Sequence, residues 1–248
     1  MEGNAKDKTL GDQGLVRSDK QKKKEKKYYG KFLVFVVLSI LSIEYYIYVF
    51  EIMFPNLNNS NFYLITILLI FFHILFLLVV CAFLATMNTN PGEIPIYWGF
   101  YIGDDDNKRK RYCLICNAFK PERAHHCSVC NICILNMDHH CPWVNNCIGF
   151  YNRKFFMQLL FYVCFLVIYY DITGAYYVIN IIINLFKKKF KWISFIHYAF
   201  VIIGYLTILI FTFIINIFFK FHVGLVLQNS TTIESLDKEH KVENENLI

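Results

Sequence analysis

The sequence predicts an all-α polytopic membrane protein with four transmembrane helices and a small two-zinc, cysteine-rich domain between helices 2 and 3. Of its 248 residues, 56% are hydrophobic and 18% aromatic, too apolar for an ordinary soluble domain. The apolar residues gather in four blocks, each long enough to cross a bilayer as a helix. Seven of the nine cysteines lie between Cys113 and Cys147. A soluble protein of this size could not cover four helices that are apolar all round.

Residues 1–31 are expected to form a disordered, basic cytosolic tail. They hold ten Lys or Arg against five acidic residues and show no hydrophobic face. Such a segment cannot bury enough apolar surface to fold alone, and its charge attracts it to anionic lipid. It is not a cleavable signal peptide, because a long polar tail precedes an apolar block longer than a signal core.

Two predicted transmembrane helices lie in residues 32–86 and two more in residues 155–219. The four apolar blocks are Phe32 to Phe54, Phe62 to Thr86, roughly Phe155 to Phe186, and Ile193 to Phe219. Each reaches or exceeds the roughly 20 residues that span the hydrocarbon core as a helix.

The distribution of basic residues predicts the orientation of these spans. The loop at 55–61 has no charge, whereas the loop at 87–154 carries eight Lys or Arg. Cytosolic loops are enriched in Lys and Arg, so both termini and the 87–154 domain are expected in the cytosol. The third loop opposes this orientation with Lys187, Lys188, Lys189 and Lys191. The two larger clusters receive more weight, because the first helix usually dominates orientation.

The 87–154 loop has the cysteine spacing of zinc-binding domains. Three C-x2-C steps occur, at Cys113/Cys116, Cys127/Cys130 and Cys130/Cys133. Two thiolates at this spacing reach one tetrahedral ion, and thiolate with imidazole favours zinc over magnesium or calcium. Disulfides are the competing interpretation. They require an oxidising compartment, whereas the predicted topology places the loop in the reducing cytosol.

The number of candidate ligands exceeds what two zinc ions need. Two tetrahedral sites use eight ligands, and three of the eleven candidates remain. Spacing does not show which cysteine is spare, but Cys141 has His139 and Asp138 beside it. A cysteine nucleophile needs such a base and such an orienting acid. The alternative is that Asp138 caps a turn and Cys141 is another ligand. The candidates are Cys113, Cys116, Cys127, Cys130, Cys133, Cys141, Cys147, His125, His126, His139 and His140.

The order of these residues resembles the DHHC protein S-acyltransferases, or palmitoyltransferases. The run reads Cys113-x2-Cys116-x3-Lys120-Pro121-x-Arg123-x2-His126-Cys127-x2-Cys130-x2-Cys133-x4-Asp138-His139-His140-Cys141-x-Trp143-x2-Asn146-Cys147-x-Gly149-x2-Asn152-x3-Phe156. The resemblance extends to Asn90-Pro91-Gly92 and to Thr231-Thr232-Ile233-Glu234, a TTxE motif in the C-terminal tail at 220–248. The chain departs from the family at Asn90, where an aspartate is usual, and it lacks a clear copy of a frequent C-terminal aromatic motif.

The resemblance implies a role for each residue. One structural zinc is expected on Cys113, Cys116, His126 and Cys133, and the other on Cys127, Cys130, His140 and Cys147. Cys141 is then the nucleophile that accepts palmitate from palmitoyl-CoA, His139 its base and Asp138 the group that orients the base. His125 has no implied role and is interpreted as a histidine either at the surface or next to the zinc ligands. Both zinc sites have four protein ligands and leave no open position for water.

The expected partners are acyl-CoA, the lipid bilayer, and cytosolic or membrane-associated proteins with juxtamembrane cysteines; nucleic acid is not expected. The residues that bind CoA are not predicted, because the basic side chains suit either its phosphates or anionic lipid. They are Lys108, Arg109, Lys110, Arg111, Lys120, Arg123, Arg153 and Lys154. The resemblance favours the endomembrane system, with the Golgi expected first and the ER or plasma membrane as alternatives.

Two other functions fit parts of the sequence. A zinc-finger scaffold could use the cysteine-rich loop to recruit partners without catalysis. A transporter could use acids inside the spans, above all Glu44 and Asp171, although these two also suit hydrogen bonds between helices. Neither alternative explains a spare cysteine beside His139 and Asp138.

Overall fold

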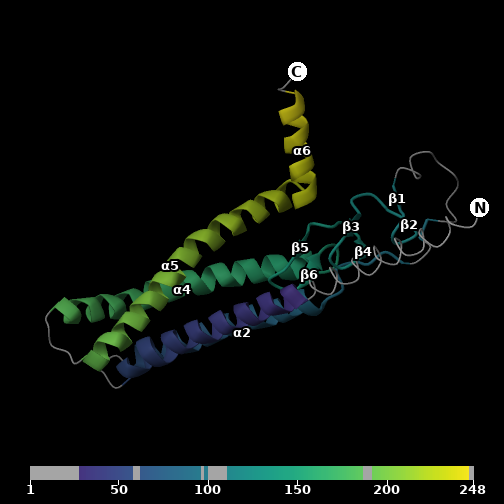
Figure 1. Cartoon of the computed structure of the whole chain (residues 1–248). Helices are drawn as coiled ribbons and strands as arrows, with labels where there is room; N and C mark the ends of the chain where they lie inside the picture. The colour runs from purple at the N-terminus through teal and green to yellow at the C-terminus, as the bar shows by residue number, and fades with distance from the viewer. Residues whose placement is uncertain (1–27, 58–61, 96–97, 100–110, 187–191, 246–248) are drawn as a thin grey trace, which may run out of the picture. The chain divides into compact units, whose positions relative to one another are not determined.

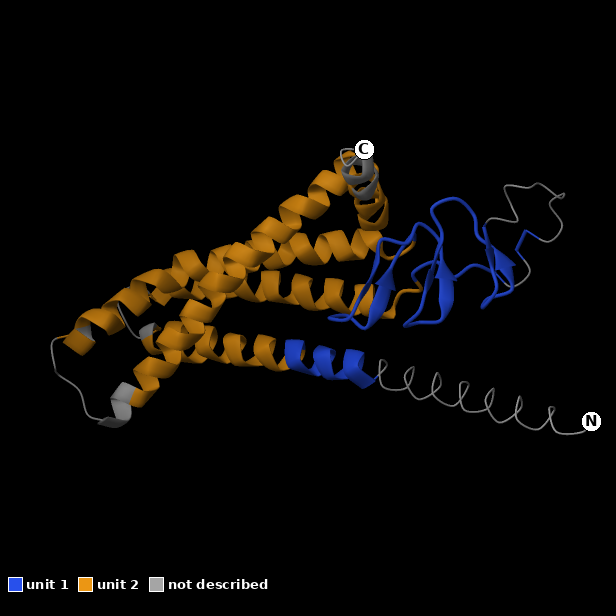
Figure 2. Cartoon of the chain, turned by 45° about the horizontal axis from the view of Figure 1, so that its top comes forward, with its two compact units in different colours: residues 1–37, 91–150 blue, residues 38–90, 151–248 orange. Residues whose placement is uncertain are grey.

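The computed structural model describes residues 28–57, 62–95, 98–99, 111–186 and 192–245, and the chain forms two compact units (Figure 2). Unit 1 comprises Met1–Val37 and Pro91–Phe150, and unit 2 comprises Leu38–Asn90 and Tyr151–Ile248. The predicted basic tail up to residue 27, the Lys108 to Lys110 run and the third-loop lysines lie outside the described residues.

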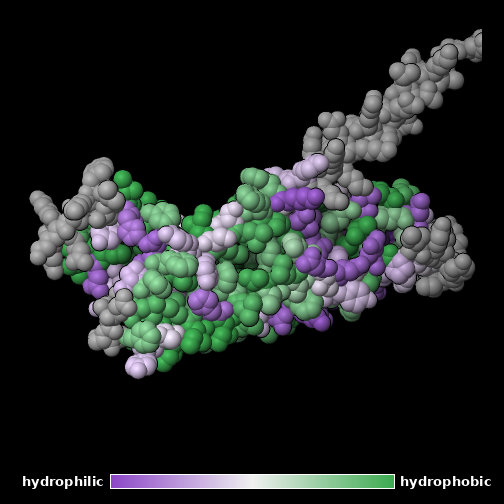
Figure 3. Space-filling model, turned by 90° about the horizontal axis from the view of Figure 1, so that it is seen from below, coloured by the Kyte–Doolittle hydropathy of each residue, from purple (hydrophilic) through white to green (hydrophobic). Residues whose placement is uncertain are grey.

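Among the described residues, four helices are long and apolar enough to cross a membrane, which confirms the predicted fold class. The spans are Tyr28–Met53, Phe62–Asn88, Arg153–Ile183 and Ile196–Leu227. Within unit 2, α2 (Phe62–Asn88) packs against α4 (Arg153–Phe186), and α4 packs against α5 (Trp192–Leu227) (Figure 1). At most 39% of the residues in each span's most apolar window are buried. Hydrophobic residues therefore cover much of the visible surface (Figure 3), as a lipid-facing exterior requires.

The inner faces of the spans are joined by aromatic packing and hydrogen bonds. The first span ends in a π-helical segment, η1 (Ile47–Met53), followed by the short 3-10 helix η2 (Phe54–Asn56). Tyr48 in η1 is fully buried, its ring lies 4.1 Å from Phe72 and 4.8 Å from Tyr170, and its hydroxyl is 2.7 Å from Thr173 Oγ1. These contacts tie the first span to α2 and α4.

Two of the acids inside the spans, Glu44 and Asp171, take part in hydrogen bonds between helices. Glu44 Oε2 accepts from the Tyr170 hydroxyl at 3.4 Å, and Asp171 Oδ2 accepts from the Thr212 hydroxyl at 2.7 Å. Polar side chains of transmembrane helices gain from such interhelical partners. The geometry agrees with a packing role for both acids.

Buried polar contacts join the end of α2 to the start of α4. Asn152 is fully buried, and its side-chain amide donates to the carbonyl of Thr86 at 3.3 Å. The guanidinium of Arg153 donates to the carbonyl of Ser230 at 2.6 Å, so the segment that follows α5 is bound to the start of α4. The two points where the chain leaves and re-enters unit 2, after α2 and before α4, are therefore held close together.

The C-terminal part is more helical than the sequence predicted. Helix α5 continues to Leu227, beyond the expected end at Phe219, and α6 (Thr232–Glu245) follows. Lys220 and His222 did not stop α5, because a helix end can carry polar side chains to the membrane surface. At the start of α6, the Thr231 N–H donates to Glu234 Oε2 at 2.8 Å and the Glu234 N–H donates to Thr231 Oγ1 at 3.2 Å. This reciprocal pair is a capping box formed by the TTxE motif.

Three antiparallel hairpins form the cysteine-rich part of unit 1, a feature that the sequence did not predict. The strands are β1 (Tyr112–Cys113), β2 (Ala118–Phe119), β3 (His125–Cys127), β4 (Ile132–Ile134), β5 (His139–Cys141) and β6 (Asn146–Ile148). They pair as β1–β2, β3–β4 and β5–β6. Few large side chains are buried here, with Ile134, Ile148 and Val144 the most enclosed. So small a core needs another source of stability, and bound metal is the usual one.

Candidate functional site

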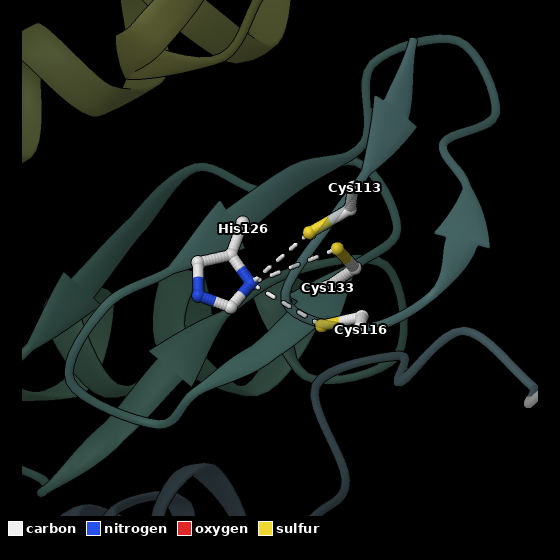
Figure 4. A group of neighbouring side chains, drawn as sticks. All are labelled: Cys113, Cys116, His126 and Cys133. Carbon is white, nitrogen blue, oxygen red and sulfur yellow. Dashed lines mark hydrogen bonds between the residues drawn. The ribbon is translucent and has the colours of Figure 1, made fainter. Parts of the chain in front are cut away.

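The first group of metal-ligating side chains consists of Cys113, Cys116, His126 and Cys133 (Figure 4). The Nδ1 atom of His126 lies 3.6 Å from the sulfur of Cys113, 3.3 Å from that of Cys116 and 3.8 Å from that of Cys133. The first two thiols come from the turn of the β1–β2 hairpin. His126 and Cys133 face each other in the β3–β4 hairpin.

The second group consists of Cys127, Cys130, His140 and Cys147. His140 Nδ1 lies 3.7 Å from the sulfur of Cys127, 3.5 Å from that of Cys130 and 3.6 Å from that of Cys147. The sulfurs of Cys130 and Cys147 are 3.4 Å apart. The turn of one hairpin again supplies two thiols, and the paired strands of the next supply a histidine and a cysteine.

Both groups have the dimensions of a zinc site. A tetrahedral ion with bonds of about 2.3 Å to sulfur and about 2.0 to 2.1 Å to nitrogen separates a nitrogen ligand from a sulfur ligand by about 3.6 Å. The six nitrogen-to-sulfur distances range from 3.3 to 3.8 Å. All nine cysteines are free thiols, so the described residues contain no disulfide. The two Cys/His groups therefore fit two zinc ions.

The alternation of strand β5 separates its three side chains. Successive residues of a strand point to opposite faces, so His140 points away from the face shared by His139 and Cys141. His140 reaches the second metal group, whereas Cys141 belongs to neither group. The Cys141 side chain is buried, with 6% of its surface exposed.

Asp138, which directly precedes β5, contacts the side chain of His139. Asp138 is 1% exposed, its Oδ2 lies 2.7 Å from Nδ1 of His139, and its backbone N–H donates to the carbonyl of Ile148 at 2.9 Å. Burial disfavours the charged imidazole, but the hydrogen bonds and charges of Asp138 and Cys141 outweigh it and raise the pKa of His139 from 6.5 to about 9. The charged form of the His139 ring is therefore favoured beside the Asp138 carboxylate.

The other sequence candidates lie elsewhere. His125 lies in β3 and belongs to neither metal group. Of the basic residues considered for phosphate, Arg111 donates to the carbonyl of Pro121 at 2.6 Å, and Arg153 to that of Ser230. Lys154 Nζ lies 4.9 Å above the ring of Phe155. The two arginines are thus occupied in holding the backbone.

Sequence reasoning missed a set of three asparagines that shape the hairpin turns. Asn117, Asn131 and Asn145 have positive φ angles of 48°, 61° and 49°. Asparagine tolerates this left-handed conformation better than most residues. Each lies four residues after the cysteine that ends the first strand of its hairpin. Their regular spacing was the signal available in the sequence.

Comparison with known proteins places this site in a family. The family model for the DHHC palmitoyltransferase matches residues 106–239, more than half of the chain. The chain belongs to the DHHC palmitoyltransferase family. The predicted resemblance is thereby confirmed, and the cysteine-rich hairpins of unit 1 lie within the matched region.

Two named S-acyltransferases are similar to this chain over most of its length, and a named palmitoyltransferase is similar over about half of it. Probable protein S-acyltransferase 13 of Arabidopsis thaliana is 30% identical over 84% of this chain and 75% of its own. Probable protein S-acyltransferase 12 of the same plant is 30% identical over 86% of this chain and 78% of its own. Palmitoyltransferase PFA4 of Mycosarcoma maydis is 43% identical over 53% of this chain and 27% of its own. The chain is therefore an enzyme of the protein S-acyltransferase class.

Proposed function

We propose that this S-acyltransferase moves a long-chain acyl group, palmitoyl in the first instance, from acyl-CoA to protein cysteines through an acyl-Cys141 intermediate. One observation carries the proposal. Cys141 is the cysteine between Cys113 and Cys147 that belongs to neither metal group, and it shares a strand face with His139, which contacts Asp138 at 2.7 Å. A free thiol, a base and an acid that orients the base are the parts of a cysteine nucleophile.

The two zinc ions have a structural role in this proposal. One is held by Cys113, Cys116, His126 and Cys133, and the other by Cys127, Cys130, His140 and Cys147. Four protein ligands close each site, so no position is left for a reacting water. Bound zinc would crosslink successive hairpins through these residues and would keep β5 in place, although the core around it is small.

In the first half-reaction, Cys141 attacks the thioester carbonyl of acyl-CoA. His139 takes the thiol proton at Nε2, because its Nδ1 is engaged by Asp138. The sulfur of Cys141 forms a bond to the carbonyl carbon, the bond from that carbon to the CoA sulfur breaks, and the imidazolium returns the proton to the departing CoA thiolate. The buried carboxylate of Asp138 stabilises the imidazolium between these two proton transfers.

In the second half-reaction, a cysteine of the substrate protein takes the acyl group. His139 removes the proton of that cysteine, its thiolate attacks the acyl-Cys141 carbonyl, and the Cys141 sulfur leaves and is reprotonated. One thioester is exchanged for another in each half, so no external energy source is required. The same base serves both halves because each begins with deprotonation of a thiol.

The acyl chain explains why the enzyme spans a membrane. Each methylene kept out of water is worth about 0.8 kcal/mol, so exposing a palmitoyl tail would cost on the order of 10 kcal/mol. We therefore expect the tail to remain in an apolar environment during transfer. Substrate cysteines are expected beside a membrane anchor of their own protein, where they reach the enzyme without leaving the bilayer surface.

The proposal includes an orientation and a location. The tail at 1–31, the catalytic domain at 87–154 and the C-terminal segment at 220–248 are assigned to the cytosolic side, on the strength of the basic residues in the first two. The Golgi is the first expected membrane, with the ER and plasma membrane next. Labelling of single introduced cysteines at positions 10 and 58 with an impermeant maleimide in sealed vesicles tests the orientation, and equal labelling at both positions would contradict it.

The central experiment incubates detergent-purified protein with labelled palmitoyl-CoA. Wild type should acquire label that hydroxylamine releases, and Cys141→Ser should acquire none. Cys81→Ser is the matched control, because Cys81 is an exposed cysteine of α2 outside both metal groups, and it should label like wild type. Label retained by Cys141→Ser at the wild-type level would refute the assignment of the nucleophile.

A further inference from the structure

The cysteine-rich segment contains a repeat of 14 residues. Cys113, Cys127 and Cys141 follow one another at this interval, and so do Asn117, Asn131 and Asn145. Each cysteine ends the first strand of a hairpin, and each asparagine has the positive φ described above. The three hairpins are therefore three copies of one turn, which begins with a cysteine and ends with a left-handed asparagine.

The position before each asparagine distinguishes the third copy. Cys116 and Cys130 stand there in the first two copies, and Val144 stands there in the third. In the first two copies, the cysteine that ends the strand and this second cysteine both belong to a metal group. The first two turns are thus complete zinc knuckles, and the third carries one of the two thiols.

The arrangement of ligands shows why the third copy has no zinc partner. Each metal group takes two thiols from one hairpin and a facing histidine–cysteine pair from the next, as Figure 4 shows for the first group. The β5–β6 hairpin gives His140 and Cys147 to the hairpin before it. No fourth copy follows in the sequence, since residue 153 already begins α4. Cys141 therefore stands in the position of a zinc ligand with His139 as a donor on the same face of β5, but with no second thiol in its turn.

Val144 places an apolar side chain where the first two copies have their second cysteine. It is 2% exposed, among the most buried residues of unit 1, while the backbone of its turn keeps the knuckle conformation at Asn145. A thiolate bound to zinc shares its lone pair with the metal and is a weaker nucleophile than a free thiolate. Replacing the second thiol by a valine keeps the turn and removes the chelate.

We propose that Val144 is a positioning residue that keeps the sulfur of Cys141 free of metal by occupying the second ligand position of a third zinc knuckle. The proposal rests on the proposed function, because it assumes that Cys141 is the nucleophile. It predicts that one substitution, Val144→Cys, turns the third hairpin into a metal-binding dithiol. The two existing zinc groups are not touched by this change.

The test measures metal content and thiol reactivity of the full-length protein in detergent, under reducing conditions and in buffered free zinc. Wild type should hold two zinc ions per chain, and Val144→Cys should hold three by native mass spectrometry. Alkylation of Cys141 by iodoacetamide, followed by peptide mass spectrometry, should slow at least about tenfold in Val144→Cys when zinc is present. A weak chelator that returns the count to two should restore the rate.

Val144→Ser is the matched control, because serine resembles cysteine in size and lacks the thiol. It should hold two zinc ions, and its Cys141 should be alkylated at a rate that does not depend on zinc. A role for Val144 in packing alone would change both variants equally. The proposal is wrong if Val144→Cys holds two zinc ions with zinc-independent alkylation, or if it holds fewer than two while Val144→Ser holds two. These readouts do not use acyl transfer, so they are separate from the palmitoyl-CoA test of the proposed function.

Discussion

Replacing Asp138 by asparagine should slow acylation of Cys141 without removing zinc. The substitution keeps the shape of the side chain and removes the charge that lies 2.7 Å from His139 Nδ1. An amide placed there also turns a donor toward the ring nitrogen, which favours the tautomer whose Nε2 carries the proton. That tautomer cannot accept the proton of the Cys141 thiol.

The structure sets the size of the effect. The pKa of His139 rises from 6.5 to about 9, and Asp138 and Cys141 share the causes that raise it. One pKa unit corresponds to about 1.4 kcal/mol, so the whole rise corresponds to about 3 kcal/mol. Asp138 comes first among the causes that raise this pKa, so the loss of its charge is worth on the order of 1 to 3 kcal/mol, or about 5- to 150-fold in the population of the ion pair. The tautomer effect adds to this loss, so the first half-reaction should slow by at least about tenfold.

The assay is single-turnover labelling with palmitoyl-CoA at pH 7, with zinc content measured on the same sample. A second readout is the difference in thermal stability between wild type and Asp138→Asn as a function of pH. Because the folded pKa of His139 is raised, its contribution to stability is complete below about pH 6.5 and is lost as the pH rises through about 9. The stability difference should therefore be largest near pH 6 and small above pH 9.

Two results would refute this reasoning. One is an Asp138→Asn enzyme that keeps two zinc ions and labels at the wild-type rate at pH 7. The other is a stability difference that grows as the pH rises, because the sign of the pKa shift forbids it.

Three further predictions concern the scaffold. Cys130→Ser removes one ligand of the second metal group, so zinc per chain measured by atomic emission should fall from about two to about one; an unchanged count would exclude Cys130 as a ligand. Gly149→Ala would place its Cβ 2.5 Å from the carbonyl oxygen of Pro91 and should lower stability by about 1 to 3 kcal/mol. The control Gly224→Ala has no heavy atom within 4 Å of the new Cβ and should leave stability unchanged. Equal melting temperatures of the two variants would contradict this prediction. Glu234→Ala removes one of the two hydrogen bonds of the capping box and should cost about 0.3 to 1.5 kcal/mol of stability in denaturant unfolding. An unchanged midpoint would argue against the cap.

The four spans could be predicted because their signal is local. Length and hydropathy are read along the chain, and every backbone group of a helix is satisfied within it, so no distant partner is needed. The predicted membrane block ended at Phe219, whereas α5 continues to Leu227, because hydropathy marks the hydrocarbon core and not the end of the helix. The capping box at Thr231 was present in the sequence but could not be placed at a helix start without that correction.

The zinc chemistry could also be predicted, but the sorting of its ligands could not. Spacing predicted two ions and three spare side chains, and the family resemblance supplied an assignment. The structure gathers the same two sets of four residues, through a hairpin register that places His126 opposite Cys133 and His140 opposite Cys147. Register depends on pairing between strands only two or three residues long, for which the sequence shows no clear alternation.

The amino-acid sequence by itself determined the membrane spans, the metal-binding composition and the family of this protein, because hydropathy, ligand type and motif spacing are properties of contiguous residues. Only the tertiary structure decided which thiols converge, that His139 contacts Asp138 at 2.7 Å, and that Arg111 and Arg153 hold backbone carbonyls. The physical reason is that distances between side chains depend on how hairpins and helices pack, and residue spacing alone does not set that packing.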